Sequence, residues 1–153
     1  MRDQPKTFMI ENAQIVFRNF SGKEGQYNRE GDRNFAVLLP DNVAKQLEND
    51  GWNVRYLAAR DEGDKDTPYL SVSVSYKNRP PKVVMMTSMS RTVLTEDSIN
   101  ILDWAEIESS DLIVNAYEWT VNGKSGIKAY LKSLFVTIEE DPLEQKYAAP
   151  EEQ

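Results

Sequence analysis

The sequence predicts a mainly antiparallel, all-β fold with one short helix, arranged as a barrel or a sandwich. Segments that alternate apolar and polar residues recur along the chain, and the clearest, residues 69–77, sets Leu70, Val72, Val74 and Tyr76 against three serines. Such alternation is typical of a strand with one buried face. A glycine-containing turn joins the last two strand-like segments, and helices do not alternate with strands as they do in α/β proteins.

Seven strands are expected, from alternation or from short apolar runs bounded by turn residues. They cover residues 8–20, 33–39, 52–59, 69–77, 82–88, 111–121 and 126–138. The last two are separated by Asn122-Gly123-Lys124-Ser125, which predicts a hairpin with Gly123 at a positive φ.

One helix is expected over residues 41–51, where Val43, Ala44 and Leu47 have helical spacing and Gly51 stands at the C-terminal stop. The turn before it, Pro40-Asp41-Asn42, is expected to supply the N-cap. Residues 95–105 are compatible with a capped helical turn or with an irregular crossover.

The composition excludes several classes of function. The 153 residues correspond to about one domain, and they include neither His nor Cys. A disulfide framework, a thiolate nucleophile, a Ser-His-Asp triad and a His- or Cys-ligated metal are therefore excluded. No signal-peptide core and no run of about 18 apolar residues occurs, so we expect a soluble, intracellular protein without a membrane partner.

The net charge of -7 is unevenly distributed. Residues 139–153 hold six acids, one base and two prolines, whereas residues 1–138 hold 17 bases and 19 acids. We therefore expect a binding domain over residues 1–138 and an acidic tail over residues 139–153, either disordered or a short helical extension. The net acidity, which at first argues against a nucleic-acid partner, describes mainly this tail.

Bases and aromatics cluster within the predicted domain. Residues 77–91 contain several Lys and Arg residues and no acidic residue, and a second group of Lys and Arg residues lies in residues 18–33. Lys128, Tyr130 and Lys132 share one face of the last predicted strand by alternation, and Asn115, Tyr117 and Trp119 share one face of its hairpin partner. A sheet that interleaves rings and cations suits single-stranded nucleic acid, which stacks its bases on rings while cations follow the phosphates.

Other interpretations of these residues remain open. Strand aromatics commonly belong to the core, and the bases of residues 77–91 also suit a solubilised edge strand. The acids of residues 61–66 suggest a cation site, but they do not match the EF-hand pattern and a solvated loop explains them better. Asp103, Glu106, Glu108 and Asp111 would allow carboxylate-based hydrolysis, which no sequence spacing can verify.

The segments YLSVSVSYKNRPPKVVMM, ILDWAEI and GIKAYLKSLFVTIEEDPLEQKY resemble the single-stranded DNA-binding proteins of tailed bacteriophages. The resemblance covers residues 8–147 and implies an OB-fold, a Greek-key barrel, here with extra strands and one short helix. It also implies a non-catalytic protein without cofactor or metal that binds and protects single-stranded DNA in the cytoplasm of an infected bacterium. Phage or host replication and recombination proteins are implied as partners of the acidic tail, although the chain ends in Gln where bacterial members end in an apolar residue.

The candidate DNA-binding residues follow from these clusters. For phosphate contacts they are Arg18, Lys23, Arg29, Arg33, Lys77, Arg79, Lys82, Arg91, Lys128 and Lys132. For base stacking they are Phe20, Tyr27, Tyr117, Trp119 and Tyr130. The alternative is a DNA-mimic or protein-interaction role for the acidic surface.

Overall fold

The computed structural model describes residues 7–26, 28–77, 79–88 and 90–139. It contains one α-helix, one 3-10 helix and nine strands within these residues. The strands are β1 (Thr7–Ala13), β2 (Ile15–Asn19), β3 (Arg33–Leu38), β4 (Val54–Leu57), β5 (Thr67–Val74), β6 (Lys82–Met86), β7 (Arg91–Leu94), β8 (Ile107–Val121) and β9 (Lys124–Ile138). The helices are α1 (Asp41–Asn49) and the 3-10 helix η1 (Ile99–Asp103). None of the helices in the described part of the chain is long and apolar enough to cross a bilayer.

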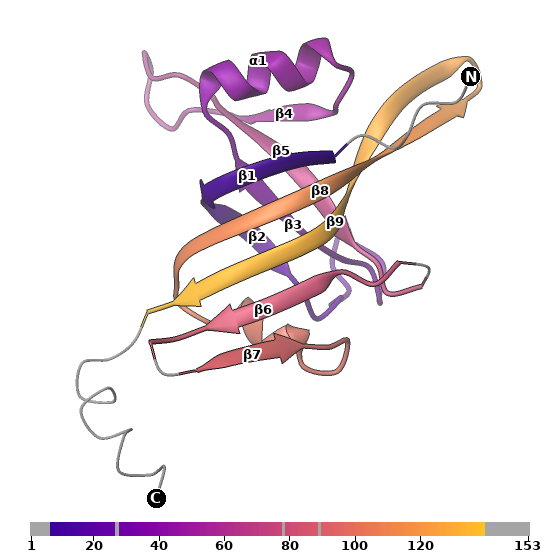
Figure 1. Cartoon of the computed structure of the whole chain (residues 1–153). Coiled ribbons are helices and arrows are strands. Elements are labelled where there is room, and N and C mark those ends of the chain that lie inside the picture. The colour runs from indigo at the N-terminus through magenta and orange to yellow at the C-terminus, as the bar shows by residue number, and fades with distance from the viewer. Residues whose placement is uncertain (1–6, 27, 78, 89, 140–153) are drawn as a thin grey trace, which may run out of the picture.

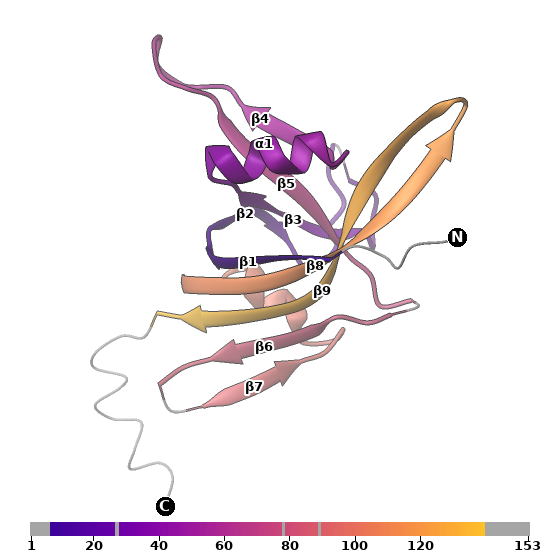
Figure 2. The same ribbon diagram turned by 45° about the horizontal axis from the view of Figure 1, so that its top comes forward.

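The strands form one sheet whose main path runs β1-β8-β9-β5-β3-β2. β4 joins β5, and the β6–β7 hairpin joins β9. Figures 1 and 2 show the sheet folded over, with β1, β8, β9 and β6 in one layer and β2, β3 and β5 in the other. The two ends of the path, β1 and β2, do not pair with each other among the described residues, so the sheet is not closed into a barrel.

The predicted β-rich class is confirmed, but the sheet is mixed. β9 pairs antiparallel with β8 and parallel with both β5 and β6. Parallel strands are not joined by a short turn, so no local turn signal in the sequence predicts their pairing.

One hydrophobic cluster fills the space between the layers. It includes Phe35 and Val37 of β3, Val72 of β5, and Leu112 and Leu134 of β8 and β9, all nearly inaccessible to solvent. Full burial of such side chains contributes roughly 1.5–3 kcal/mol each. The core therefore holds the two layers together and fixes which faces of β5 and β9 point outward.

Several local predictions are confirmed. Helix α1 buries Ala44 and Leu47, and Gly51 follows it at a φ of 98°. The β8–β9 turn places both Asn122 and Gly123 at positive φ, as the hairpin signal required.

Other local predictions are wrong in detail. Residues 8–20 form two strands separated at Gln14, and β7 was not predicted. Pro40 occupies the N-cap position of α1, and no side chain accepts a hydrogen bond from the backbone amides of the first helical turn. The predicted turn therefore supplies no side-chain N-cap. Residues 95–105 contain the 3-10 helix, which matches the helical-turn alternative.

A β-bulge interrupts the last strand at Lys132. Ile113 pairs with Ser133 and Val114 with Leu131, which leaves Lys132 without a partner on β8. The buried residues of β9 consequently change from odd to even positions across the bulge. Strand alternation thus fails at one of the predicted site residues.

Candidate nucleic-acid interface

Three adjoining clefts lie over the outward faces of β3, β5 and the first half of β9. The Trp119 cleft has a volume of about 600 Å³, the Arg33 cleft about 820 Å³ and the Arg79 cleft about 420 Å³. The first two share Ser73 and Lys128, and the last two share Ser75 and Tyr130. The three clefts therefore form a continuous surface, which we call the groove.

The alternation of β5 builds the floor of the groove. Leu70, Val72 and Val74 point into the core, so Ser71 and Ser73 point outward. Ser73 pairs in register with Tyr130 of β9 and with Asn34 of β3. Small side chains on the central strand leave room for a ligand between the larger groups on either side.

The centre of the groove combines two rings and a cation. The Lys128 Nζ lies 5.2 Å from the centroid of the Tyr130 ring, and the Tyr117 ring meets Tyr130 edge-on at 6.0 Å. Tyr117 is 58% exposed, so it is not a core residue. The arrangement offers a ring face beside a cation, which is what a base and its phosphate require.

Trp119 forms one wall of the groove because its neighbour across the hairpin is a glycine. Trp119 pairs with Gly126, and a Cβ on Gly126 would lie 2.9 Å from the Trp119 Cζ2 atom. The Trp119 ring therefore lies against the backbone of β9 and is 37% exposed. The interpretation of strand aromatics as core residues therefore does not apply to Trp119.

Arg33 and Tyr76 form a second ring–cation pair. The Arg33 guanidinium lies 5.6 Å from the Tyr76 centroid and 3.3 Å from the Glu96 carboxylate. The pKa of the Tyr76 hydroxyl is raised above its ordinary value, mainly because the group is buried. The charge of Arg33 partly opposes this increase and that of Glu96 adds to it. Within the described residues, neither the Tyr76 hydroxyl nor the Arg33 Nε has a hydrogen-bond partner.

The groove is positively charged although the chain is acidic. Its lining includes six bases, which are Arg29, Arg33, Arg55, Lys77, Arg79 and Lys128. The lining includes two acids, and each of them, Asp32 and Glu96, is paired with an arginine. Local charge of this kind attracts a polyanion whatever the sign of the whole molecule.

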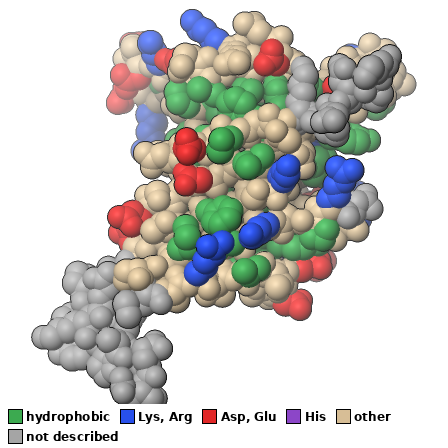
Figure 3. All heavy atoms as spheres, viewed as in Figure 1, with side chains coloured by type: hydrophobic (Ala, Val, Ile, Leu, Met, Phe, Trp, Pro, Cys, Tyr) green, Lys and Arg blue, Asp and Glu red, His purple; other side chains and the backbone are tan. Residues whose placement is uncertain are grey.

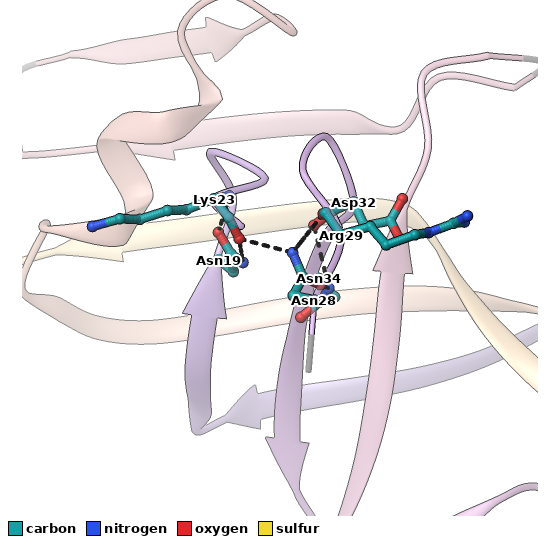
Figure 4. A network of polar contacts seen from close by, with 6 residues as sticks. All are labelled: Asn19, Lys23, Asn28, Arg29, Asp32 and Asn34. Atoms are coloured by element: carbon teal, nitrogen blue, oxygen red, sulfur yellow. Dashed lines mark hydrogen bonds and ion pairs between the residues drawn. The ribbon is translucent and has the colours of Figure 1, made fainter. Parts of the chain in front are cut away.

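The loop between β2 and β3 is held by asparagines (Figure 4). The Asn28 amide donates to the carbonyls of Lys23 at 2.9 Å and of Asp32 at 3.0 Å, and Asn34 donates to Asn28. The Lys23 and Arg29 side chains extend from this network in different directions in Figure 4. Arg29 lines the Arg33 cleft of the groove, whereas Lys23 lines a fourth cleft beyond it.

Two predicted contact residues have structural roles. Phe20 has no exposed surface and stacks on Phe35 at 5.1 Å, so the prediction that it stacks on a base is wrong. The Arg18 Nη1 donates to the carbonyls of Leu102 at 2.9 Å and Ala105 at 2.7 Å, so this guanidinium connects β2 to η1. These hydrogen bonds give Arg18 a structural role, and its phosphate contact stays a prediction.

The candidate acids of η1 and β8 also bind backbone. The Asp103 carboxylate accepts from the Phe20 amide at 2.6 Å and from the Ser21 amide at 3.0 Å. Asp111 accepts from the Asn12 amide at 2.7 Å. These hydrogen bonds give both carboxylates a structural role.

Lys82 and Arg91 lie over a different ring, on the side of β6, β7 and β9. Their cationic groups lie 5.8 Å and 5.6 Å from the Phe135 centroid. Figure 3 shows Lys and Arg side chains among hydrophobic atoms over this part of the molecule.

Lys132 is exposed at the bulge and lines none of the three clefts of the groove. Tyr27 and residues 140–153 of the predicted tail lie outside the described residues.

Sequence reasoning missed several residues of the groove, among them Tyr69, Arg55 and Phe17. Tyr69 shares the serine face of β5, so the alternation already seen there was sufficient to identify it. Arg55 lines the Trp119 cleft from β4. Phe17 gave no signal, because alternation places it on the same face as the buried Ile15 and a bulge turns it outward.

Comparison with known proteins assigns the family. Residues 1–152 match the family model described as "Putative phage ssDNA-binding domain". The chain belongs to this family of phage single-stranded DNA-binding proteins. No curated protein matches the chain significantly.

Two solved structures are similar to the chain. One is the single-stranded DNA-binding protein from bacteriophage Enc34 in complex with ssDNA, at 12% identity and a TM-score of 0.57 over 89% of this chain and 88% of that one. The other is a C-terminal truncation of the Enc34 protein, at 14% identity and a TM-score of 0.56 over 89% of this chain and 87% of that one. At such low identity the likeness concerns the fold.

Proposed function

We propose that this phage protein binds single-stranded DNA along the groove, with little sequence preference and without catalysis. Bases stack on Tyr130, Tyr117 and Trp119, and phosphates follow the surrounding Arg and Lys side chains. The observation that carries the proposal is the Lys128–Tyr130–Tyr117 cluster at the centre of a positively charged groove. Stacking and charge tolerate any base, because every base has a π-face and every nucleotide a phosphate.

We assign the architecture to an elaborated OB-fold. The folded-over β-sheet and the similarity to the Enc34 protein support this assignment, and OB-folds bind oligonucleotides on one sheet face and its loops. The surplus strands, with helix α1, are additions to that core. The domain of residues 1–138 then holds the binding surface, and residues 139–153 form its acidic tail.

We expect the protein to act in the cytoplasm of the infected bacterium, during DNA replication or recombination, because it belongs to a family of phage proteins. The tail competes with DNA for the groove and offers a contact to replication or recombination proteins. The acids of the tail and the bases of the groove support the first role by charge complementarity.

Lys82 and Arg91 provide a secondary phosphate contact. Two cations over Phe135 repeat the ring–cation arrangement of the groove, on the same strand β9. This second surface lies beyond the Lys132 bulge. It is therefore expected to contribute to binding of long strands more than of short ones.

The central test is Tyr130→Ala, measured by fluorescence anisotropy with labelled oligo-dT. Loss of the ring is expected to weaken binding by about 1 kcal/mol or more, because one base loses its stacking partner. Lys128→Ala should also reduce the slope of log K against log salt by about 0.7, because one phosphate contact is lost. The fold, measured by circular dichroism, should remain unchanged in both variants.

Two exposed residues outside the groove serve as matched controls. Lys45 lies on the exposed side of α1 and Tyr56 lies on β4, where its ring is 47% exposed. Lys45→Ala and Tyr56→Ala should bind as the wild type does. Equal effects of the control and groove variants would refute the groove. A wild-type protein that fails to retard any single-stranded oligonucleotide at low salt would instead favour the DNA-mimic alternative.

A further inference from the structure

A fourth cleft continues the groove past β2, at a place that the proposed function does not use. The Trp104 cleft has a volume of about 450 Å³ and meets the Trp119 cleft at Phe17, which lines both. Trp104 and Lys23 also line this cleft. We propose, on the basis of the proposed function, that single-stranded DNA continues from the groove into this cleft and stacks bases on Phe17 and Trp104.

The backbone of Phe17 is held in a conformation that large side chains rarely adopt. Its φ is 52°, at the bulge where the β2–β3 register breaks between Val16 and Asn19. Positive φ is common for asparagine, as at Asn12 of this chain, but for a residue of this size it is a strained outlier. Strain of this kind persists where the surrounding structure imposes it, and it is concentrated at ligand sites.

Burial does not account for the position of the Phe17 ring. The residue is 58% exposed, so the bulge turns a large apolar side chain toward solvent. The ring meets Tyr69 edge-on at 5.9 Å, and Tyr69 belongs to the groove. Bulges commonly redirect a side chain next to a functional site, and here the redirected side chain connects two clefts.

Trp104 is exposed on a firmly held turn. It is 70% exposed, the highest fraction among the large exposed hydrophobic residues of the described chain. On one side Asp103 accepts the Phe20 and Ser21 amides, and on the other the Ala105 carbonyl accepts from Arg18. The backbone on both sides of the ring is thus fixed to the end of β2. Because this backbone is already fixed, little conformational entropy of the turn is lost when a base stacks on the Trp104 ring.

The Trp104 cleft carries little net charge. Its lining includes two basic side chains, Arg18 and Lys23, and two acidic ones, Glu24 and Asp103, so their formal charges sum to zero. Its contribution to DNA binding should therefore come from stacking and should not depend on salt. The Trp104 cleft differs in this respect from the groove, where basic side chains outnumber acidic ones.

The first experiment measures the affinity of the full chain for oligo-dT of increasing length, from about 4 to about 16 nucleotides. Trp104→Ala should weaken binding of the long oligonucleotides about fivefold or more and leave the short ones unchanged. Phe17→Ala should weaken binding of the long oligonucleotides at least as much, and it should also affect the short ones because the Phe17 ring lines the Trp119 cleft as well. The slope of log K against log salt should stay at its wild-type value in both variants. Tyr56→Ala, which removes an exposed ring outside the clefts, is the matched control.

Phe17→Gly separates binding from folding. Glycine accepts a positive φ without strain, so this variant should fold at least as well as Phe17→Ala and show the same loss of long-oligonucleotide binding. If Phe17→Gly restored wild-type affinity, the ring would have no role in binding and the proposal would be overturned.

Trp104 can also report on the strand directly. A Trp119→Phe variant retains Trp104 and Trp52, and Trp52 is only 5% exposed. Long oligo-dT should quench the emission of the exposed tryptophan, whereas short oligo-dT should quench it much less. Absence of quenching with saturating long oligonucleotide would overturn the proposal.

The remaining outcomes distinguish this inference from the proposed function. If Tyr130→Ala weakens binding at every length but the Phe17 and Trp104 variants bind normally, the groove stands and its extension fails. If Tyr130→Ala has no effect at any length, the groove itself fails. If Trp104→Ala changes only self-association in sedimentation, the cleft is a protein contact and the extension is overturned.

Discussion

Gly126 contributes no side chain to the groove, and the Trp119 ring lies where a Cβ would point. The pairing of a large ring with a glycine across a hairpin lets the ring lie close to the backbone of the neighbouring strand. The position of Trp119 thus depends on a residue that cannot itself contact DNA through a side chain. A sequence search for aromatic and basic residues does not find such a contribution.

Gly126→Ala tests this dependence. The added methyl group would lie 2.9 Å from Cζ2 of Trp119, so the ring must move away from β9. In a Trp104→Phe background, we expect a shift in tryptophan emission and weaker oligo-dT binding, by up to about 1 kcal/mol. Gly25→Ala is the control for tryptophan emission, since nothing lies within 4 Å of its added Cβ. Unchanged emission and affinity in Gly126→Ala would show that Trp119 does not need the glycine.

Tyr76→Phe is expected to stabilise the protein. The variant removes a buried hydroxyl that has no hydrogen-bond partner among the described residues, and an unsatisfied group of this kind costs about 1–3 kcal/mol. Burial also raises the pKa of Tyr76 above the ordinary value of 10.0, so the unfolded chain ionises first as the pH increases. The wild type therefore loses stability as the pH rises above that value, while the variant does not lose this contribution.

Urea unfolding at pH 7 and at increasing alkaline pH measures both effects. The difference in unfolding free energy between Tyr76→Phe and wild type should be positive and should grow as the pH rises. A difference that shrinks with pH would contradict the raised pKa. Binding of oligo-dT should change little, because the ring that faces Arg33 is retained.

At the scale of elements, the Arg18 and Asp103 side chains join β2 to η1. Each makes two hydrogen bonds to the backbone of the other segment. Sequence reasoning interpreted Arg18 as a phosphate contact and Asp103 as a possible catalytic acid. Both residue types suit those roles, and only the fold shows that their charges are engaged elsewhere.

Arg18→Met and Lys128→Met should therefore change different properties of the protein, the first its stability and the second the salt dependence of DNA binding. Arg18→Met is expected to lower the free energy of unfolding by about 2 kcal/mol, because hydrogen bonds from a charged donor are lost, and to leave the salt slope of DNA binding unchanged. Lys128→Met should leave stability nearly unchanged and reduce that slope. Urea unfolding and salt titrations of the two variants make the comparison. A reduced salt slope in Arg18→Met would restore it as a phosphate contact.

The strands themselves were largely predictable, and their partners were not. Alternation over residues 69–77 correctly separated the core side of β5 from its serine side. Bulges defeat this reasoning, because one extra residue reverses the alternation, as at Lys132, or turns a ring outward, as at Phe17. The groove arises where β5 meets β9, two strands far apart in sequence, and local patterns carry no information on such a pairing.

At the scale of the whole molecule, the charge is divided between a basic groove and an acidic C-terminal segment. Residues 140–153 carry five acids and one base. A chain ending at Glu139 keeps the hydrogen bond from the Glu139 amide to the Glu106 carbonyl, so the end of the sheet is preserved. We expect this shortened protein to bind oligo-dT several-fold more tightly at low salt and equally at high salt, where charges are screened. Anisotropy titrations across salt measure the difference, and weaker binding at low salt would refute competition by the tail.

The position of β9 has a consequence for how the chain is made. β9 is the last strand among the described residues, yet it pairs with β8, β5 and β6 and supplies core residues such as Leu134 and Val136. While the ribosome is still synthesising the chain, β5 and β6 have no β9 to pair with. Long-range pairings of this kind slow folding, and stable structure is therefore expected only after residue 138 has left the exit tunnel. The nascent protein would thus acquire its groove in the same late step that completes its core.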